Sequence, residues 1–247
     1  MAILVPTTWN PADKDSTITL SNGNKTAVSA GGSVRSVFGA TSGKHYWEYT
    51  ISSGTAQMVG VATPATNLLY YPGQDATAWA YEKASGSIYN NGAPVQTVAA
   101  SGTNIGVLLD AAGKKLRFRR NGVLVGTDIT LTGSVWHAIF GYGSTCVANF
   151  GASAFAYSVP DGYIAGLGAL LYTISGNVKD DTGANAARAV RAYDRATGAF
   201  SGSTVSDAGT GNYSLTTPFS GEHTLVFLDD DAGAAYNALV LDRVTGV

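Results

Sequence analysis

The sequence is poor in charge and nearly devoid of cysteine. Charged residues make up 13% of its 247 residues and the net charge is −2, whereas about 25% of the residues in an average domain are charged. So few cations exclude the broad positive surface by which proteins hold nucleic acid. The one cysteine, Cys146, permits no internal disulfide, and its apolar surroundings predict a packed rather than a reactive thiol.

Long apolar runs and catalytic motifs are missing as well. The N-terminus has no basic region and only a short apolar run, so we expect no signal peptide. The longest apolar stretch, YIAGLGALLYTI, is far shorter than the roughly 20 residues that cross a bilayer, so we expect no membrane insertion. The chain has no G-x-S-x-G, H-E-x-x-H or P-loop motif and no Cys/His cluster. We therefore predict no catalytic residue, no cofactor and no metal site.

Two features that resemble metal ligands are better explained without a metal. The three histidines, His45, His137 and His223, fall in separate expected strands and share no ligand spacing. The acidic run at residues 229–231 resembles part of a calcium loop, but Ca²⁺ needs six to eight converging oxygens. We expect a solvated turn there, and cation binding by that turn stays an open alternative.

The residues that are abundant favour β-structure. Thirty-one glycines and thirteen tyrosines accompany short alternating runs, of which SGKHYWEYTI (residues 42–51) is the clearest. Lys44, Tyr46, Glu48 and Thr50 fall on one side of this run, and His45, Trp47, Tyr49 and Ile51 fall on the other. This period of two predicts a strand with one buried face. We expect Trp47 to lie in the core.

A second segment predicts a pair of strands joined by tight turns. Residues 105–109 read as a buried strand, and Leu116 and Phe118 alternate with basic residues in the next strand. Asn121 and Gly122 then supply the positive φ angles that a tight hairpin turn requires. No long segment with helical period precedes Pro160, so we predict an all-β fold.

The chain also divides into two parts. After VPDGY, which ends at Tyr163, a small apolar segment leads into a new series of short strands separated by Asp, Gly and Thr turns. A spacing of roughly 8–12 residues between turns is typical of a small sandwich. We predict a β-sandwich domain with an N-terminal extension at residues 1–163, a linker or docking segment at 164–172, and a small Ig-like β domain at 173–247.

The first part resembles the SPRY (B30.2-like) family. SGKHYWEYTI is similar to the family's signature strand, and MVGVAT, AWAYEKASGSIYNNG, GVLLDAAGKKLRFRRNGVLVG, HAIFGYGSTCVANFG and FAYSVPDGY follow in the family's order and spacing over residues 33–163. The resemblance implies a concanavalin-like sandwich of two antiparallel sheets and an interaction module without catalysis. RING and SOCS-box segments, which accompany eukaryotic SPRY domains, are absent from this sequence.

The second part resembles the small Ig/transthyretin-like β module of bacteriophage structural proteins. VRAYDRATGAFSGSTVSD, GNYSLTT and LDDDAGAAYNALVLDRVTGV carry this likeness. The two resemblances together imply a virion component, either a tail, fibre or capsid-decoration protein, made in the host cytoplasm and contacting other virion proteins. We expect a homo-oligomer, with a trimer as the first guess. IAGLGALLY is either its subunit contact or a segment that folds back on its own sandwich.

The expected binding residues are Tyr70, Tyr71, Asp75 and Tyr142. Tyr70 and Tyr71 lie beside Pro72 and Gly73 in a loop where a ring has no obvious core to enter, and exposed tyrosines serve protein and sugar recognition. The SPRY resemblance implies that such loops, including the turn at Tyr142, form the partner surface. The competing interpretation is that these rings only cover the end of the sandwich.

Two alternative functions belong to other classes. The first is a carbohydrate-binding module that contacts glycans of the host surface. The second is a glycan-cleaving enzyme, which needs two carboxylates that flank a cleft. Glu48, Glu82 and Asp110 are the candidate acids in the sandwich, and catalysis is the least favoured of the three readings.

Overall fold

The computed structural model describes residues 2–51, 57–98, 102–180, 182–228 and 239–247. The described residues form β-strands and no helix, which confirms the all-β prediction. Accordingly, this part of the chain contains no helix of the length and hydropathy that crossing a bilayer requires. The acidic run at residues 229–231 lies outside the described residues.

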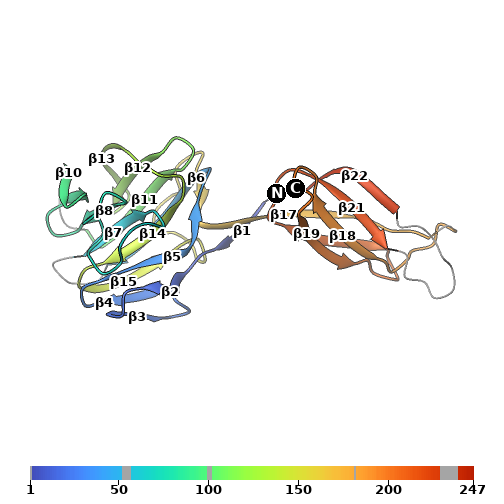
Figure 1. Ribbon diagram of the computed structural model, residues 1–247, viewed down its shortest axis with the longest axis horizontal. Coiled ribbons are helices and arrows are strands. Elements are labelled where there is room, and N and C mark those ends of the chain that lie inside the picture. Colours follow the sequence, from blue (N-terminus) through green and yellow to red (C-terminus); the bar gives the residue numbers. More distant parts are fainter. Residues whose placement is uncertain (1, 52–56, 99–101, 181, 229–238) are drawn as a thin grey trace. The chain divides into compact units, whose positions relative to one another are not determined.

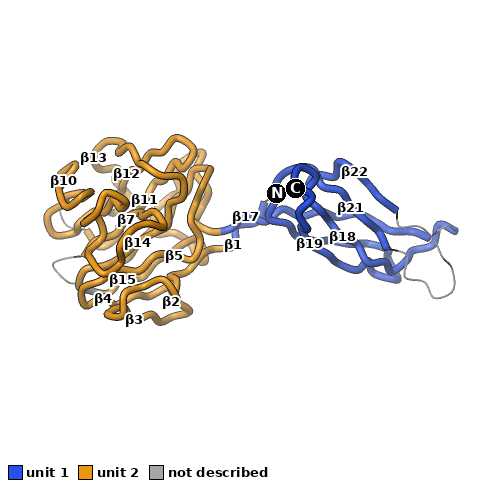
Figure 2. The backbone as a smooth tube through the Cα atoms, viewed as in Figure 1, with its two compact units in different colours: residues 1–5, 169–247 blue, residues 6–168 orange. Residues whose placement is uncertain are grey.

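The chain folds into two compact units (Figure 2). One comprises Pro6–Gly168, and the other combines Met1–Val5 with Ala169–Val247. The division at Gly168 falls inside the segment 164–172, for which a linker or docking role was expected. The first five residues differ from expectation, because they belong with the end of the chain rather than with the sandwich that follows them.

The larger unit is a sandwich of two antiparallel sheets (Figure 1). One sheet has the order β10 (Ala93–Thr97), β9 (Ser87–Asn90), β8 (Ala78–Glu82), β7 (Met58–Ala62), β14 (Trp136–Gly141), β5 (Ser33–Ala40) and β2 (Trp9–Lys14). The other has the order β13 (Val123–Thr130), β12 (Lys115–Arg120), β11 (Asn104–Asp110), β6 (Lys44–Ile51), β15 (Ser144–Asn149), β4 (Thr26–Ser29) and β3 (Ile18–Ser21). This architecture is the one that the SPRY resemblance implies.

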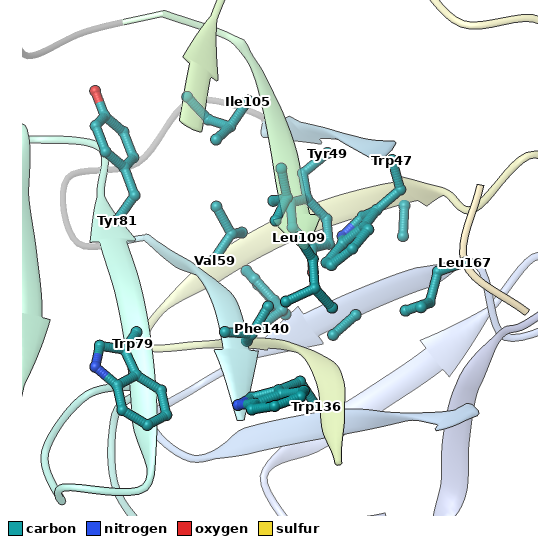
Figure 3. Close-up of a cluster of buried hydrophobic side chains, with 14 of the residues drawn as sticks. Trp47, Tyr49, Val59, Trp79, Tyr81, Ile105, Leu109, Trp136, Phe140 and Leu167 are labelled. Carbon is teal, nitrogen blue, oxygen red and sulfur yellow. The ribbon is translucent and has the colours of Figure 1, made fainter. Parts of the chain in front are cut away.

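Aromatic and branched side chains fill the space between these sheets (Figure 3). Trp47 and Tyr49 of β6 are fully buried, which confirms the inward face predicted for this strand. The Trp9 ring stacks on the Tyr49 ring with 5.9 Å between centroids. Cys146 is buried beside them, and burial raises the pKa of its thiol, so the packed reading of this residue is confirmed.

The opposite face of β6 is also buried, which the alternating pattern did not predict. Tyr46 is fully buried and Glu48 is 3% exposed, because residues 150–158, here called the strap, cross this face. The Glu48 carboxylate accepts hydrogen bonds from four donors: Tyr46 Oη (2.7 Å), Asn104 Nδ2 (3.1 Å), the Ala156 amide (2.8 Å) and the Tyr157 amide (3.0 Å). A buried charge is tolerated when its lone pairs are satisfied in this way.

The first part of the segment at 164–172 packs on the larger sandwich. Its first residues form β16 (Ile164–Ala165), which pairs in parallel with β6. The Leu167 side chain is fully buried in the core, and the Gly166 carbonyl lies 3.1 Å from His45 Nδ1. Residues 169–172 belong to β17 (Gly168–Asn177) of the smaller unit. IAGLGALLY is thus divided between the two units, and its role as a subunit contact stays a prediction.

The smaller unit is a sandwich of unequal sheets. The first has the order β1 (Ile3–Pro6), β17 (Gly168–Asn177) and β20 (Asn212–Thr217). The second has the order β19 (Phe200–Val205), β18 (Ala189–Asp194), β21 (Glu222–Leu228) and β22 (Leu239–Thr245). A separate core lies between them, made of Ile174, Val178, Val190, Ala192, Tyr213, Leu215, Leu225 and Phe227.

Candidate binding surface

The loop between β7 and β8 carries three of the four predicted binding residues. Its backbone is fixed from two sides. On one side Ser33 donates from its amide to the Leu68 carbonyl at 2.8 Å and from its hydroxyl to the Tyr70 carbonyl at 2.6 Å. On the other side the Gly92 amide, in the β9–β10 turn, donates to the Gly73 carbonyl at 2.9 Å. The tyrosines are therefore presented on a rigid loop.

Gly73 is required at the point where this loop passes the neighbouring strand. Its φ is +88°, and a Cβ added there would lie 2.7 Å from the Tyr89 carbonyl oxygen. No other residue fits both the angle and the space. Gly73 thus sets the position of Tyr71, two residues earlier, against β9.

Asp75 orders the loop rather than offering a free carboxylate. Its Oδ1 accepts hydrogen bonds from the Thr77 amide at 2.8 Å and the Thr77 hydroxyl at 2.6 Å. Its Oδ2 accepts one from the Asn67 amide at 3.0 Å. The geometry gives Asp75 the role of a positioning residue for the adjoining tyrosines.

Tyr142 stands at a corner where the chain passes from one sheet to the other. It follows β14 of the first sheet, and after Gly143 the chain enters β15 of the second. Tyr142 has φ +68° and Gly143 φ +71°. The Tyr142 amide donates to the Gly32 carbonyl at 3.3 Å, which ties the corner to the start of β5.

The corner brings Tyr142 onto the loop. The Tyr71 and Tyr142 rings lie 5.4 Å apart at a tilt of 55°. Tyr70 is 54% exposed and Tyr142 41%, whereas Tyr71 is half-buried between them. We call Tyr70, Tyr71 and Tyr142 the tyrosine surface.

Two residues beside this surface were missed by sequence reasoning. Leu69 is 68% exposed next to Tyr70, and the Tyr89 ring meets the Tyr71 ring edge-on at 6.4 Å. The run LLYY in a loop is a signal that points to Leu69. No local signal points to Tyr89, because its contact depends on how the β9–β10 turn docks on the loop.

The loop of the tyrosine surface carries little charge. Asp75 is the only charged residue in the loop segment 67–77, and its carboxylate is engaged as described. Burial, followed by the neighbouring Tyr89, raises the pKa of the Tyr71 hydroxyl, so this group remains a neutral hydrogen-bond donor near pH 7. The surface offers aromatic faces and hydroxyls, which suits a partner without strong charge.

The three carboxylates considered for catalysis are engaged separately. Glu48 is held under the strap, and Asp110 Oδ1 accepts a hydrogen bond from the Gly113 amide at 2.7 Å. Glu48 pairs with Gly106 in the β6–β11 register, four residues from Asp110, which corresponds to about 13 Å along a strand. Glu82 lies on β8 of the other sheet and accepts a hydrogen bond from the Ser85 hydroxyl.

The histidines also have separate partners. His137 Nδ1 lies 2.8 Å from the Ser36 carbonyl oxygen, and His223 Nε2 lies 3.1 Å from the Thr217 hydroxyl. Among the described residues no three His, Cys, Asp or Glu side chains gather in a way that could hold a metal ion.

Comparison with solved structures supports the architecture of the larger unit. The TRIM65 PSpry domain is 21% identical, with a TM-score of 0.51 over 59% of this chain and 92% of that one. The SPRY domain of human HERC1 is 19% identical, with a TM-score of 0.49 over 57% and 96% of the two chains. Stonustoxin is 23% identical, with a TM-score of 0.49 over 59% of this chain and 27% of its own.

Comparison of the sequences finds one domain family that matches part of this chain. No curated protein matches this chain. The SPRY domain family model matches residues 44–153, a span that begins at β6 and includes the Tyr70–Tyr71 loop and the Tyr142 corner. A SPRY domain suggests a protein-binding or adhesion module. Residues 44–153 of this chain are a SPRY domain.

Proposed function

We propose that this chain is a non-enzymatic binding component of a bacteriophage particle, and that the tyrosine surface contacts its receptor. The observation that carries the proposal is the backbone of Tyr142. A non-glycine residue at positive φ costs of order 1–3 kcal/mol, and such strain gathers at functional sites. Here it holds an aromatic ring 41% exposed to solvent.

The other turns of the chain make this choice informative. Asn91 and Asn121 occupy the corresponding positive-φ positions before Gly92 and Gly122, and asparagine tolerates that region far better than a bulky residue does. Tyr142 is the one aromatic among the described non-glycine residues with positive φ. Lys114 and Arg243 also adopt positive φ, but a tyrosine gains no turn stability over asparagine there, which supports a use for the exposed ring outside the turn.

The virion assignment rests on the sequence of the second unit. Its motifs resemble those of the small β modules in bacteriophage structural proteins, and it follows a SPRY domain in one chain. We accordingly propose a tail, fibre or capsid-decoration protein, located in the virion, that contacts other virion proteins and forms a homo-oligomer. Repetition of a small neutral surface raises avidity by about 10²–10⁴ over a single site.

The engagement of the acids supports the non-enzymatic reading. Glycoside hydrolysis requires two carboxyl groups within about 5–9.5 Å that flank a substrate. Glu48 is buried with four donors, and Asp110 lies about 13 Å along the sheet from it. Incubation of the chain with host polysaccharide should therefore release no reducing ends, and release that is lost on Glu82→Gln would contradict the proposal.

The binding test uses the full chain and two variants. Fluorescently labelled protein is applied to intact bacterial cells and to an array of bacterial surface glycans. Tyr70→Ala and Tyr142→Asn should each lower binding about tenfold or more, since central aromatic contacts are worth about 1–4 kcal/mol. Val37→Ala, at an exposed position of β5 (56%), is the matched control and should leave binding unchanged.

The same experiment separates the two candidate receptors. Binding to the glycan array would assign the carbohydrate-binding function, which the exposed tyrosine rings favour as the second candidate. Binding to cells that is lost after protease treatment would assign a protein receptor. Binding that Tyr70→Ala and Tyr142→Asn leave intact would overturn the assignment of the site. If mass analysis of purified phage particles does not find the chain, the virion assignment is overturned.

A further inference from the structure

The smaller unit has one closed and one open side. Strand β19 of the four-stranded sheet lies against β20 of the three-stranded sheet, so the two sheets meet there. Strands β1 and β22 are the remaining edges, and they border the opposite side. The chain end reaches across this side at one point, where Val247 and Thr173 of β17 exchange two backbone hydrogen bonds of 2.9 Å.

The core of the unit is uncovered at β22. Leu239 pairs with Phe227 and Leu241 with Leu225 in the β21–β22 register, and directly paired residues point to the same face. Phe227 and Leu225 belong to the core, so Leu239 and Leu241 point to the core side. They are nevertheless 60% and 43% exposed, because the opposite sheet has one strand fewer.

Most of the exposed apolar side chains described for this unit lie on the same side. Those at least two-fifths exposed on β1, on β22 and at the chain end are Ile3, Val5, Leu239, Val240, Leu241 and Val247. Phe200 and Val205 are exposed as well, but they lie on β19 at the other edge of the four-stranded sheet. An exposed apolar edge strand with free backbone groups is a template for pairing with another strand. We call these six residues the open side.

We propose that the open side is the contact between two copies of this chain, which pair antiparallel through β22 about a two-fold axis. The sequence Leu239-Val240-Leu241 reads the same in both directions. An antiparallel copy centred on Val240 therefore places leucine opposite leucine and valine opposite valine. The two leucines of each copy then cover those of the other on the core side.

The charges around the open side permit this self-pairing. Strand β1 carries no charged residue, and Leu239–Leu241 carries none either. The next residue, Asp242, is neutralised within its own chain, because Arg195 Nε lies 2.8 Å from its Oδ1 and the Thr224 hydroxyl donates to the same oxygen at 3.0 Å. Arg243 also lies in β22, but an antiparallel copy centred on Val240 places the two Arg243 residues six positions apart, about 20 Å along the strand. Like charges therefore do not meet at the centre of this isologous contact.

The proposal names the surface for the homo-oligomer of the proposed function and changes its expected stoichiometry. The first residues of IAGLGALLY pack within the larger unit, and the proposal places the subunit contact on the open side instead. A two-fold contact gives dimers rather than the trimer first expected. Receptor binding by the tyrosine surface is also measured on the monomeric variant Val240→Lys, so failure of one proposal is distinguishable from failure of the other.

The test is sedimentation of the full chain over a range of concentrations. The native chain should sediment as a dimer, and the double variant Leu239→Lys with Leu241→Lys as a monomer. Val205→Lys is the matched control: it is 63% exposed on β19, the other edge of the same sheet, and should remain dimeric. The single variant Val240→Lys, whose side chain points away from the core, should also give monomers and decides the matter if the double variant unfolds.

Hydrogen exchange supplies a second readout. Amides of β22 should become more protected as the native chain is concentrated, and those of β19 should not. A native chain that is a monomer at every concentration, a trimer, or a dimer that survives both Val240→Lys and the double variant would each overturn the proposal. Monomers that still bind cells through the tyrosine surface would leave the receptor assignment standing.

Discussion

At the scale of single residues, burial is decided by what crosses a strand as much as by the strand's own pattern. The alternation in β6 correctly predicts Trp47 and Tyr49 in the core. It does not predict that Tyr46 and Glu48 are buried too, because the strap that covers them follows about 100 residues later in the sequence. The signal for that cover is the carboxylate in the middle of an aromatic run: Tyr46 supplies one donor, and the other donors must come from distant parts of the chain.

Truncation of Trp47 tests the inward face of β6. Trp47→Ala should lower the free energy of unfolding by about 3–5 kcal/mol, the usual loss for a large core side chain. Chemical denaturation followed by circular dichroism measures it. Val37→Ala, at a half-exposed position, should change the free energy by less than about 0.5 kcal/mol. A loss below about 1 kcal/mol for Trp47→Ala would mean that the ring is not in the core.

Neutralisation of Glu48 tests the strap. Glu48→Gln replaces one acceptor oxygen by an amide that faces a backbone donor, so the free energy of unfolding should fall by about 2–4 kcal/mol. Exchange of the Ala156 and Tyr157 amides should accelerate. Glu82→Gln, whose carboxylate is bonded by the Ser85 hydroxyl at a turn, is the control. Equal effects of the two substitutions would contradict the role of Glu48 as the anchor.

At the scale of elements, the tight turns were predictable and the long-range pairings were not. Asn91-Gly92 and Asn121-Gly122 do adopt positive φ, since the residue types needed there are few. The place of β1 could not be derived, because four apolar residues have no pattern that names a partner about 165 positions away. The tyrosine surface falls between these cases: Tyr70 and Tyr142 are singled out by loop position, and only the fold joins Tyr142 to Tyr71.

Aspartate–threonine turns make both units sensitive to acid. Hydrogen bonds from Thr17 hold the pKa of Asp15 below its usual range, and those from Thr182 and Thr210 do the same for the pKa values of Asp180 and Asp207. A pKa lowered by folding contributes stability above the unfolded pKa of about 3.9, and this contribution is lost as pH falls through the folded pKa. The melting temperature should therefore drop progressively below about pH 4.

Tryptophan fluorescence separates the acid-induced loss of stability in the larger unit from that in the smaller unit. Trp9, Trp47, Trp79 and Trp136 all lie in Pro6–Gly168, so tryptophan fluorescence follows the larger unit alone. Asp15→Asn should flatten the acid dependence of the fluorescence transition. The double variant Asp180→Asn with Asp207→Asn should flatten the acid dependence of the smaller unit's unfolding. That transition is seen by circular dichroism and not by tryptophan fluorescence. Unchanged acid dependence in these variants would contradict the assignment.

At the scale of the whole molecule, the smaller unit is made of two pieces of the chain. In the sequence, the SPRY domain separates the first strand of this unit from its other strands. We therefore expect Met1–Val5 to contribute to the stability of the smaller unit, although a whole domain separates this segment from the rest of that unit in the sequence.

Deletion of residues 1–5 tests that arrangement. Without most of β1, the smaller unit loses an edge strand. Its melting temperature should fall by about 4–8 °C for each kcal/mol of unfolding free energy that is lost. The transition followed by tryptophan fluorescence should not move. A shift of the fluorescence transition, or no shift in circular dichroism, would show that β1 belongs energetically to the larger unit.

We propose that Tyr142 is kept for binding and not for packing, and the stability of the variant Tyr142→Asn tests this without a ligand. Tyr142→Asn relieves backbone strain of order 1 kcal/mol and removes a ring contact worth about 0.5–1.5 kcal/mol. The measurement is the free energy of unfolding by chemical denaturation. We expect the free energy of unfolding of Tyr142→Asn to be unchanged within about 1 kcal/mol, or raised. A loss of more than about 2 kcal/mol would show that the ring covers the end of the sandwich, and would contradict the claim.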